Sequence, residues 1–583
     1  MSARPGVADR SEEVVVSEVV RERGLVATMD DGVGLVADAW HPEGSGPWPV
    51  LLQRLPYGRS VASAPVLPSP VELARRGYAV VVQDVRGRGD SEGVFEPFVN
   101  EATDGAATVE WAAALPFSNG DVVTYGYSYQ GLVQLLAAAR RPPSLRGVAA
   151  MMCGSEPYEG WTYLGGCLQW SFVATWAAQL AAQEPGATPR RPDLDALPIA
   201  AALGGDPPPW FRAWLDHPDD DAFWAAVRPD LGAIDVPVFS VVGYFDQFAA
   251  ATARLVAAIG AEAVCGPWAH MPWGTHLGGA ELGVDAGPAP AITAFLRFCD
   301  RILLGAPPGG TPDRGGRPVR PDPPSAPARV RWYSLDGGWR DAPRWPPPGT
   351  MAQWTAVSGG GACSRHGDGR LVAGAADPGP PDVVVAEPLV PHPGDLDPWE
   401  QVAAAEDRRD VACYTSPPLA EALDLAGSAI LTARVRADAA TFDLIASLVR
   451  VDPADDARRL ATGARRVVAV RPDRTAAGGG DPGIAVGHHT AVVTVEIGPL
   501  AWHAQPGQRL RLDVSASRFP AFDRNPQRLT VGGPPRAGRP EHRVATIELL
   551  DVRVELPCVG PTRGADVGPA DAILPPVNPD PGR

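Results

Sequence analysis

The sequence contains no lysine, so all of its basic side chains are arginines, and acidic residues outnumber them. With 51 basic and 68 acidic residues, the formal net charge is -17. A nucleic-acid-binding protein needs a basic patch that neutralises phosphates, so we expect no nucleic-acid partner. The excess of acid by itself indicates only a well-solvated surface.

Cysteine is also scarce, and its spacing forms no pattern. The seven cysteines are odd in number, and no two of them form a C-x-x-C pair. This distribution argues against a disulfide framework and against a zinc site. We therefore expect neither a metal nor any other cofactor.

Long apolar runs are absent as well. No stretch of about 18 apolar residues is present to span a membrane. The N-terminus, MSARPGVADRSEEVVV, lacks the basic start and the apolar core of a signal peptide. We therefore expect a cytoplasmic protein with no membrane partner, and we leave a homodimer open.

What the sequence does have is length and clear segmentation. A chain of 583 residues is too long for one hydrophobic core, so several domains are expected. Residues 1–20 form a polar lead, and from Gly34 onward strand-like runs alternate with helical ones. This alternation predicts a mostly parallel sheet covered by helices over residues 21–152.

The character of the chain changes twice after that. Residues 153–232 place tryptophans among Ala- and Pro-rich helical segments, which we interpret as a helical cap. The sheet resumes over residues 233–305 and is followed by a Pro/Gly/Arg linker at 306–329. Many short strands over residues 330–583 then predict an all-β sandwich or jelly roll.

The first chemical signal is the stretch TYGYSYQG, residues 124–131. Ser128 falls between an apolar strand and a helix, where a strained turn would lift its hydroxyl above the sheet edge. The usual G-x-S-x-G motif has glycine at the place of Gln130, and here glycine comes one residue later, as Gly131. Alone, this partial match fits an ordinary strand-to-helix turn equally well.

A serine hydroxyl needs a base, and in such folds the partners follow it in the order acid, then histidine. Asp246 comes directly after a strand in GYFDQF, and His270 comes directly after another in GPWAH. Both should lie with Ser128 at the carboxyl edge of the sheet. His276 is an alternative base or a pocket residue, whereas His41 comes in the wrong order.

Acyl transfer also requires hydrogen-bond donors for the developing oxyanion. The backbone N–H of Tyr129, next to the nucleophile, is one candidate. The loop LPYGR offers the hydroxyl of Tyr57 as the second, the alternative being a turn tyrosine packed on the cap. We expect the charges of QDVRGRGDS, residues 83–91, to brace loops by ion pairing.

Several of these motifs occur in the order found in one known family. They are PYGR, QDVRGRGDSEG, GYSYQG, GYFDQF, GPWAH, YTSPPL at 414–419 and SRFPAFDRNP at 517–526. Together they span about residues 30 to 550 and resemble the CocE/NonD family of serine hydrolases. This cocaine esterase-like family is related to X-prolyl dipeptidyl peptidases and α-amino acid ester hydrolases.

The resemblance implies an α/β-hydrolase fold with a helical cap insertion plus a C-terminal all-β jelly-roll domain. It implies Ser128, Asp246 and His270 as the catalytic triad. It also implies the Tyr57 hydroxyl and the Tyr129 N–H as the oxyanion donors.

Four further residues are predicted to bind the substrate. Phe248, two residues after the acid, matches an aromatic position that lines the acyl pocket of the family. Gln130 adjoins the nucleophile, and Trp161 and Trp170 lie in the cap. The chain departs from many relatives at Tyr244, where they have tryptophan, and this leaves the substrate open.

Three functions remain as hypotheses. The first is a serine esterase or acyl hydrolase that cleaves a small-molecule ester or activated amide through an acyl-enzyme intermediate. The second is an acyltransferase or X-prolyl-type peptidase with the same triad; a peptidase would need carboxylates such as Glu156, Glu159 and Asp216 to hold the substrate ammonium. The third is a non-catalytic protein that binds carbohydrate through the jelly roll, and an intact triad argues against it.

Overall fold

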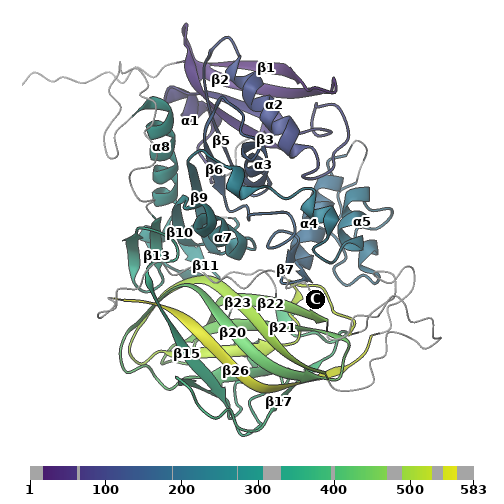
Figure 1. Cartoon of the computed structure of the whole chain (residues 1–583), viewed down its shortest axis with the longest axis vertical. Coiled ribbons are helices and arrows are strands. Elements are labelled where there is room, and N and C mark those ends of the chain that lie inside the picture. Colours follow the sequence, from purple (N-terminus) through teal and green to yellow (C-terminus); the bar gives the residue numbers. More distant parts are fainter. Residues whose placement is uncertain are drawn as a thin grey trace, which may run out of the picture.

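The computed structural model describes residues 18–61, 66–184, 186, 188–271, 273–305, 330–394, 401–468, 489–527 and 542–560. Figure 1 shows an α/β body, a helical cap on its flank and a β-rich domain beneath both. The predicted linker at 306–329 lies outside the described residues, as do residues 1–17 of the predicted lead. Among the described residues, no helix is long and apolar enough to cross a membrane.

The α/β body is built on a ten-stranded sheet with the order β1-β2-β4-β3-β5-β6-β9-β10-β13-β14. Its strands are β1 (Val19–Thr28), β2 (Gly34–Pro42), β3 (Trp48–Leu55), β4 (Ala79–Asp84), β5 (Ser118–Tyr127), β6 (Leu145–Met151), β9 (Val238–Phe245), β10 (Glu262–Ala269), β13 (Val330–Ser334) and β14 (Gly338–Ala342). From β4 to β13 all neighbours pair in parallel. Such strands are buried on both faces, which explains the continuous apolar runs in their sequence.

Helices cover both faces of this sheet (Figure 1). They are α1 (Pro70–Arg75), α2 (Glu101–Ala113), α3 (Tyr129–Ala138), α7 (Ala249–Ile259) and α8 (Ala289–Leu304), with the short turns η1 (Arg59–Val61), η3 (Leu231–Ala233) and η4 (Val284–Ala286) and the small hairpin β11 (His276–Leu277)–β12 (Ala280–Glu281). Side chains of α2, α3 and α7 share one apolar core with the sheet, and those of α1 and α8 share the other. The predicted mostly parallel sheet between helical layers is therefore present.

The sheet is wider than the sequence indicated. Strand β1 begins at Val19, inside the predicted lead. The sequence did not indicate this strand because most of its side chains are partly or fully exposed and give little apolar signal. At the other edge, Val330 of β13 pairs with Ala263 of β10, so the hairpin β13–β14 extends the hydrolase sheet. The start of the C-terminal domain at 330 stays a prediction, since strand alternation does not encode which sheet a strand joins.

The cap lies between β6 and β9. It consists of α4 (Trp170–Ala181), η2 (Ile199–Ala201), α5 (Pro209–Asp216) and α6 (Ala222–Ala225), together with a hairpin of β7 (Tyr163–Leu164) and β8 (Cys167–Leu168). The helical interpretation of the cap missed this hairpin. A Cβ added at Gly165 in its turn would lie 2.0 Å from the carbonyl oxygen of Ala464, so the hairpin packs directly on the β-rich domain.

The β-rich domain follows the strand path β22-β21-β24-β19-β16-β15-β26-β20-β23, with β17 paired to β26. Its elements are β15 (Gly349–Val357), β16 (Arg370–Ala373), β17 (Asp382–Ala386), β18 (Pro393–Gly394), α9 (Ala403–Glu406), β19 (Val411–Thr415), β20 (Leu423–Ala437), β21 (Thr441–Val451), β22 (Ala457–Val468), β23 (His489–Ala504), β24 (Arg509–Ser515), β25 (Phe519–Pro520) and β26 (Ala545–Val559). The two ends of the path lie against each other. A Cβ added at Gly463 in β22 would lie 1.9 Å from the carbonyl oxygen of Glu496 in β23. The sheet therefore curls back on itself, and its assignment as a jelly roll stays a prediction.

One arginine joins the three domains. The guanidinium of Arg254 on α7 lies 3.2 Å from a carboxylate oxygen of Glu159 in the cap and 2.8 Å from one of Glu496 in β23. Although burial lowers the pKa of Arg254, the charges of Glu496 and Glu159 raise it above its usual value. We call this group the three-domain ion pair.

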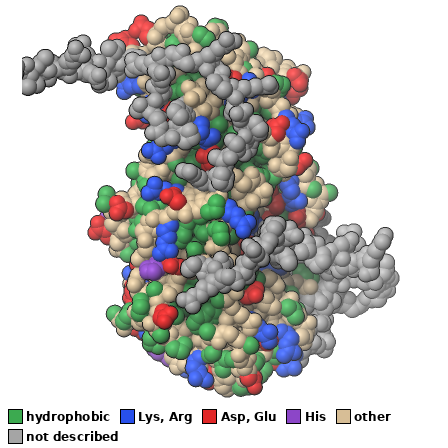
Figure 2. Space-filling model, turned by 60° about the vertical axis from the view of Figure 1, so that its left-hand side comes forward, with side chains coloured by type: hydrophobic (Ala, Val, Ile, Leu, Met, Phe, Trp, Pro, Cys, Tyr) green, Lys and Arg blue, Asp and Glu red, His purple; other side chains and the backbone are tan. Residues whose placement is uncertain are grey.

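On the face drawn in Figure 2, acidic and basic side chains are interspersed.

Candidate active site

Ser128 lies between β5 and α3 in a backbone conformation that residues with a side chain rarely adopt, with φ 61° and ψ −136°. Two neighbouring glycines allow this turn. A Cβ added at Gly126 would lie 2.6 Å from the Cβ of Gln130, and one added at Gly131 would lie 2.8 Å from the Cβ of Cys153. The close helix contact thus falls at Gly131, which explains why Gln130 can occupy the usual glycine position.

The structure brings Ser128, His270 and Asp246 together, as their order in the sequence predicts. His270 Nε2 lies 3.0 Å from Ser128 Oγ, and His270 Nδ1 lies 2.9 Å from Asp246 Oδ1. Ser128 and Asp246 are each only 6% exposed. With Asp246 ionised, Nδ1 donates to the carboxylate and Nε2 is left to accept the serine proton.

Aromatic rings fix the position of the imidazole. The ring of Phe248 meets His270 edge-to-face at 5.2 Å, and the ring of Tyr127 lies 5.4 Å from it on another side. Phe248 in turn stacks on Trp161, with 4.3 Å between ring centres and 5° between planes. Phe248 therefore lies between the histidine and the fully buried Trp161.

The two predicted oxyanion donors lie on elements that flank the serine. Tyr57 follows β3, and its hydroxyl oxygen accepts a hydrogen bond from Trp176 Nε1 at 3.0 Å. Burial raises the pKa of Tyr57 to about 12, although hydrogen bonds with Trp176 and Ser128 oppose the rise, so the phenol keeps its proton at neutral pH. The backbone N–H of Tyr129 is in the first turn of α3 and has no acceptor within the helix.

The loop that carries Tyr57 is braced by the charged motif at 83–91. Arg59, two residues after Tyr57, binds Asp84 at 2.5 Å. Arg88 donates to the carbonyl of Pro56 at 2.9 Å. The prediction that these charges brace loops by ion pairing is confirmed.

The remaining predicted substrate-binding residues have partners inside the protein. Gln130 accepts a hydrogen bond from Gln53 at 2.6 Å, and the fully buried Trp170 donates to the carbonyl of Leu194 at 3.0 Å. Their role in substrate binding stays a prediction. Sequence reasoning missed Trp176, because nothing in the pattern separates it from the other tryptophans of the cap.

The carboxylates weighed for a peptidase are engaged elsewhere. Glu156 pairs with Arg228, and Glu159 pairs with Arg254. Asp216, at the end of α5, is exposed to solvent. Their negative charges are therefore neutralised by arginine or hydrated, which disfavours them as a site for a substrate ammonium.

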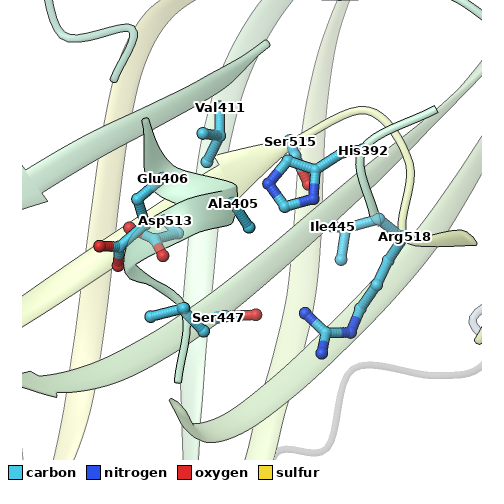
Figure 3. A pocket seen from close by; sticks show the side chains of 10 residues that line it. His392, Ala405, Glu406, Val411, Ile445, Ser447, Asp513, Ser515 and Arg518 are labelled. Atoms are coloured by element: carbon cyan, nitrogen blue, oxygen red, sulfur yellow. The ribbon is translucent and has the colours of Figure 1, made fainter. Parts of the chain in front are cut away.

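Away from the triad, the described residues contain no group of three or more His, Cys, Asp or Glu side chains that could hold a metal ion. A small cavity of about 20 Å³ lies in the β-rich domain (Figure 3). It is lined by His392, Val402, Ala405, Glu406, Val411, Ile445, Ser447, Asp513, Ser515 and Arg518. None of the predicted catalytic residues is among them.

Comparison with known proteins places this site in a family. Residues 31–272 match the X-Pro dipeptidyl-peptidase (S15) family, and residues 325–544 match the X-Pro dipeptidyl-peptidase C-terminal non-catalytic domain. Cocaine esterase from Rhodococcus sp. (strain MB1 Bresler) is 29% identical over 548 residues, which cover 86% of this chain and 91% of that protein. Over both regions the chain is similar to these families, and it is a CocE/NonD-like serine hydrolase.

Solved structures extend the likeness to the fold. An aminopeptidase from the marine sediment archaeon Thaumarchaeota archaeon has a TM-score of 0.75 at 20% identity, covering 96% of this chain and 99% of its own. A CocE/NonD family hydrolase from Staphylococcus aureus has a TM-score of 0.65 at 18% identity, covering 93% and 94%. The CocE/NonD fold, an α/β-hydrolase body with a C-terminal β-rich domain, is thereby confirmed.

Proposed function

We propose that the protein hydrolyses an ester or activated amide of a small molecule through an acyl-enzyme at Ser128. His270 Nε2 takes the proton of the Ser128 hydroxyl while Oγ bonds to the substrate carbonyl carbon. Asp246 stabilises the resulting imidazolium through Nδ1. The proton then passes from Nε2 to the leaving atom, whose bond to the carbonyl carbon breaks.

The oxyanion formed in this step requires donors that are already in place. The neutral Tyr57 phenol and the Tyr129 N–H are the groups we assign to it, because each offers a proton beside Ser128. Such donors act strongly in a site from which water is largely excluded. A water molecule then gives a proton to His270 Nε2 and bonds to the acyl carbonyl carbon. The bond from that carbon to Ser128 Oγ breaks, Nε2 returns the proton to Oγ, and the acid is released.

The single observation that carries the proposal is the unbroken hydrogen-bond chain from Asp246 through His270 to a serine held on a strained turn. Backbone strain at Ser128 costs free energy, and a turn with a purely structural role would not need it. Activation of a nucleophile accounts for it.

The surroundings favour an ester over a peptide. Aromatic rings adjoin the triad at Phe248 and continue into the cap at Trp176 and Trp210. These rings suit an apolar acyl group. A peptidase would need an uncompensated carboxylate for the substrate ammonium, and Glu156 and Glu159 are already paired with arginines.

A fluorophosphonate probe tests the proposal directly. The protein and Ser128→Ala are incubated with the probe, and the labelled peptide is located by mass spectrometry. Ser171→Ala, which removes a buried cap serine outside the triad, is the matched control. Labelling confined to Ser128 supports the proposal, whereas a folded protein that neither reacts nor cleaves an aryl acetate contradicts it. Products formed with competing amines separate hydrolysis from acyl transfer.

Two further expectations, the cellular compartment and the oligomeric state, remain part of the proposal. The seven cysteines are all free, which suits a reducing compartment such as the cytoplasm. Fractionation of producing cells followed by activity measurement tests this placement. A homodimer stays a prediction that the molar mass in solution decides.

A further inference from the structure

The cap contributes a hydrogen bond to the group that we assign as an oxyanion donor. Trp176 lies on α4, 119 residues from Tyr57 in sequence, and its indole Nε1 lies 3.0 Å from the Tyr57 hydroxyl oxygen. Indole N–H is a donor only, so the direction of this hydrogen bond is fixed. The phenol oxygen of Tyr57 therefore accepts the Trp176 N–H through one of its lone pairs. The phenol proton is left for another acceptor.

The indole is held in one position by its neighbours. Its ring stacks on Trp214 at 5.8 Å with 4° between planes, and on Tyr129 at 5.7 Å with 27°. The rings of Trp161 and Trp210 meet it edge-on at 6.1 Å and 5.4 Å. Trp176 is only 5% exposed, so a packed aromatic cluster fixes the direction in which its N–H points.

A second contact ties the C-terminal end of α4 to the loop of Tyr57. Arg88 donates to the carbonyl of Pro56 at 2.9 Å and to the side chain of Gln183, just past α4, at 2.6 Å. The loop and the helix are thus joined at two points. The distance between Trp176 and Tyr57 is therefore a fixed feature of the cap-to-body interface.

We propose that Trp176 is a positioning residue that orients the Tyr57 hydroxyl toward the oxyanion and strengthens its donation. This inference rests on the proposed role of Tyr57. A phenol whose oxygen accepts a hydrogen bond is a better donor, because each bond polarises the next. The cap thereby supplies part of the catalytic geometry as well as a binding surface.

A double-mutant cycle tests the inference. Trp176→Phe keeps an aromatic ring and removes the N–H, and Tyr57→Phe removes the donor itself. With an aryl acetate, Tyr57→Phe is expected to lower kcat about 10²–10³-fold. Trp176→Phe is expected to lower it about tenfold, the size of one neutral hydrogen bond, with KM little changed. In the Tyr57→Phe background, Trp176→Phe should have no further effect, since its action passes through the phenol.

The control and the outcomes separate the inference from the proposed function. Trp224→Phe removes another cap indole N–H, bonded to the carbonyl of His217, and should leave kcat within twofold. If Trp176→Phe lowers kcat by the same factor with and without the Tyr57 hydroxyl, Trp176 acts only through packing and the inference is overturned. An unchanged kcat for Trp176→Phe overturns it as well. Full activity of Tyr57→Phe instead contradicts the oxyanion assignment itself.

Discussion

Asp246 holds His270 with one oxygen only. Oδ1 lies 2.9 Å from His270 Nδ1, whereas Oδ2 is buried and has no hydrogen-bond partner in the part of the chain that the structure describes. The orientation of the imidazole therefore depends on a single charge-assisted hydrogen bond. Aromatic packing by Phe248 and Tyr127 limits its tilt but cannot choose its tautomer.

We expect Asp246→Asn to lower kcat about 10³–10⁴-fold without unfolding the protein. The amide can donate to Nδ1, which places the imidazole proton on Nε2, where the serine proton has to be accepted. Steady-state hydrolysis of an aryl acetate and the melting temperature check both parts. A loss smaller than tenfold would mean that Asp246 does not orient the base.

Gly131→Ala should destabilise the turn that carries the nucleophile. The added Cβ would lie 2.8 Å from the Cβ of Cys153 and 3.1 Å from the carbonyl oxygen of Gly126, and backbone cannot easily give way. We expect a loss of about 1–3 kcal/mol in the free energy of unfolding. Urea unfolding measures it, and Gly560→Ala, which meets nothing within 4 Å, is the control. Equal free energies of unfolding for the two variants would contradict the prediction.

The cavity of Figure 3 places two carboxyl groups, those of Glu406 and Asp513, beside each other. Burial and the nearby charge of Glu406 raise the pKa of Asp513 well above its usual range. The folded protein therefore keeps a proton that the unfolded chain releases near pH 4, so stability falls as pH rises from there toward the folded pKa.

Asp513→Asn should remove this pH dependence. Relative to the unmutated protein, the variant is expected to gain stability between pH 5 and pH 8, because asparagine has no proton to lose. Urea unfolding at both pH values gives the difference, with the exposed Asp206→Asn as control. A difference that is the same at both pH values would show that Asp513 is not protonated in the folded state.

Arg254→Met should disrupt the three-domain ion pair. The carboxylates of Glu159 and Glu496 would then lie close together at the domain interface without the guanidinium that contacts both. We expect a loss of about 1–3 kcal/mol, between the values for exposed and for fully buried pairs that lose one partner, because these side chains are partly buried. Arg436→Met breaks a surface pair with Glu548 and should cost less than about 1 kcal/mol. Comparable melting temperatures for the two variants would contradict the prediction.

The sequence was sufficient to predict that Ser128, Asp246 and His270 lie together, because of how the sheet is built. Parallel strands end at one edge, so a serine, an aspartate and a histidine that each follow a strand must lie near one another. The prediction that Ser128, Asp246 and His270 lie near one another therefore required no measured distances. The fold class followed from the same alternation of strands and helices.

The sequence was not sufficient where partners come from different elements. Trp161, Trp170 and Trp176 stand in similar apolar surroundings, and only the packing of the cap determines which indole reaches Tyr57. Similarly, β13 and β14 have the alternation of the β-rich domain but join the hydrolase sheet through β10. Periodicity identifies a buried face and leaves its partner undetermined.

The three-domain ion pair also limits how this enzyme can change over evolution. The hairpin β7–β8 is fixed on one side by the contact of Gly165 with the β-rich domain and on the other by Glu159 and Arg254. Mutations there would have to be matched in two other domains at once. New specificities should therefore arise through α4 and α5, and exchanging the β-rich domain between relatives should succeed only where the acceptor for Arg254 is exchanged intact.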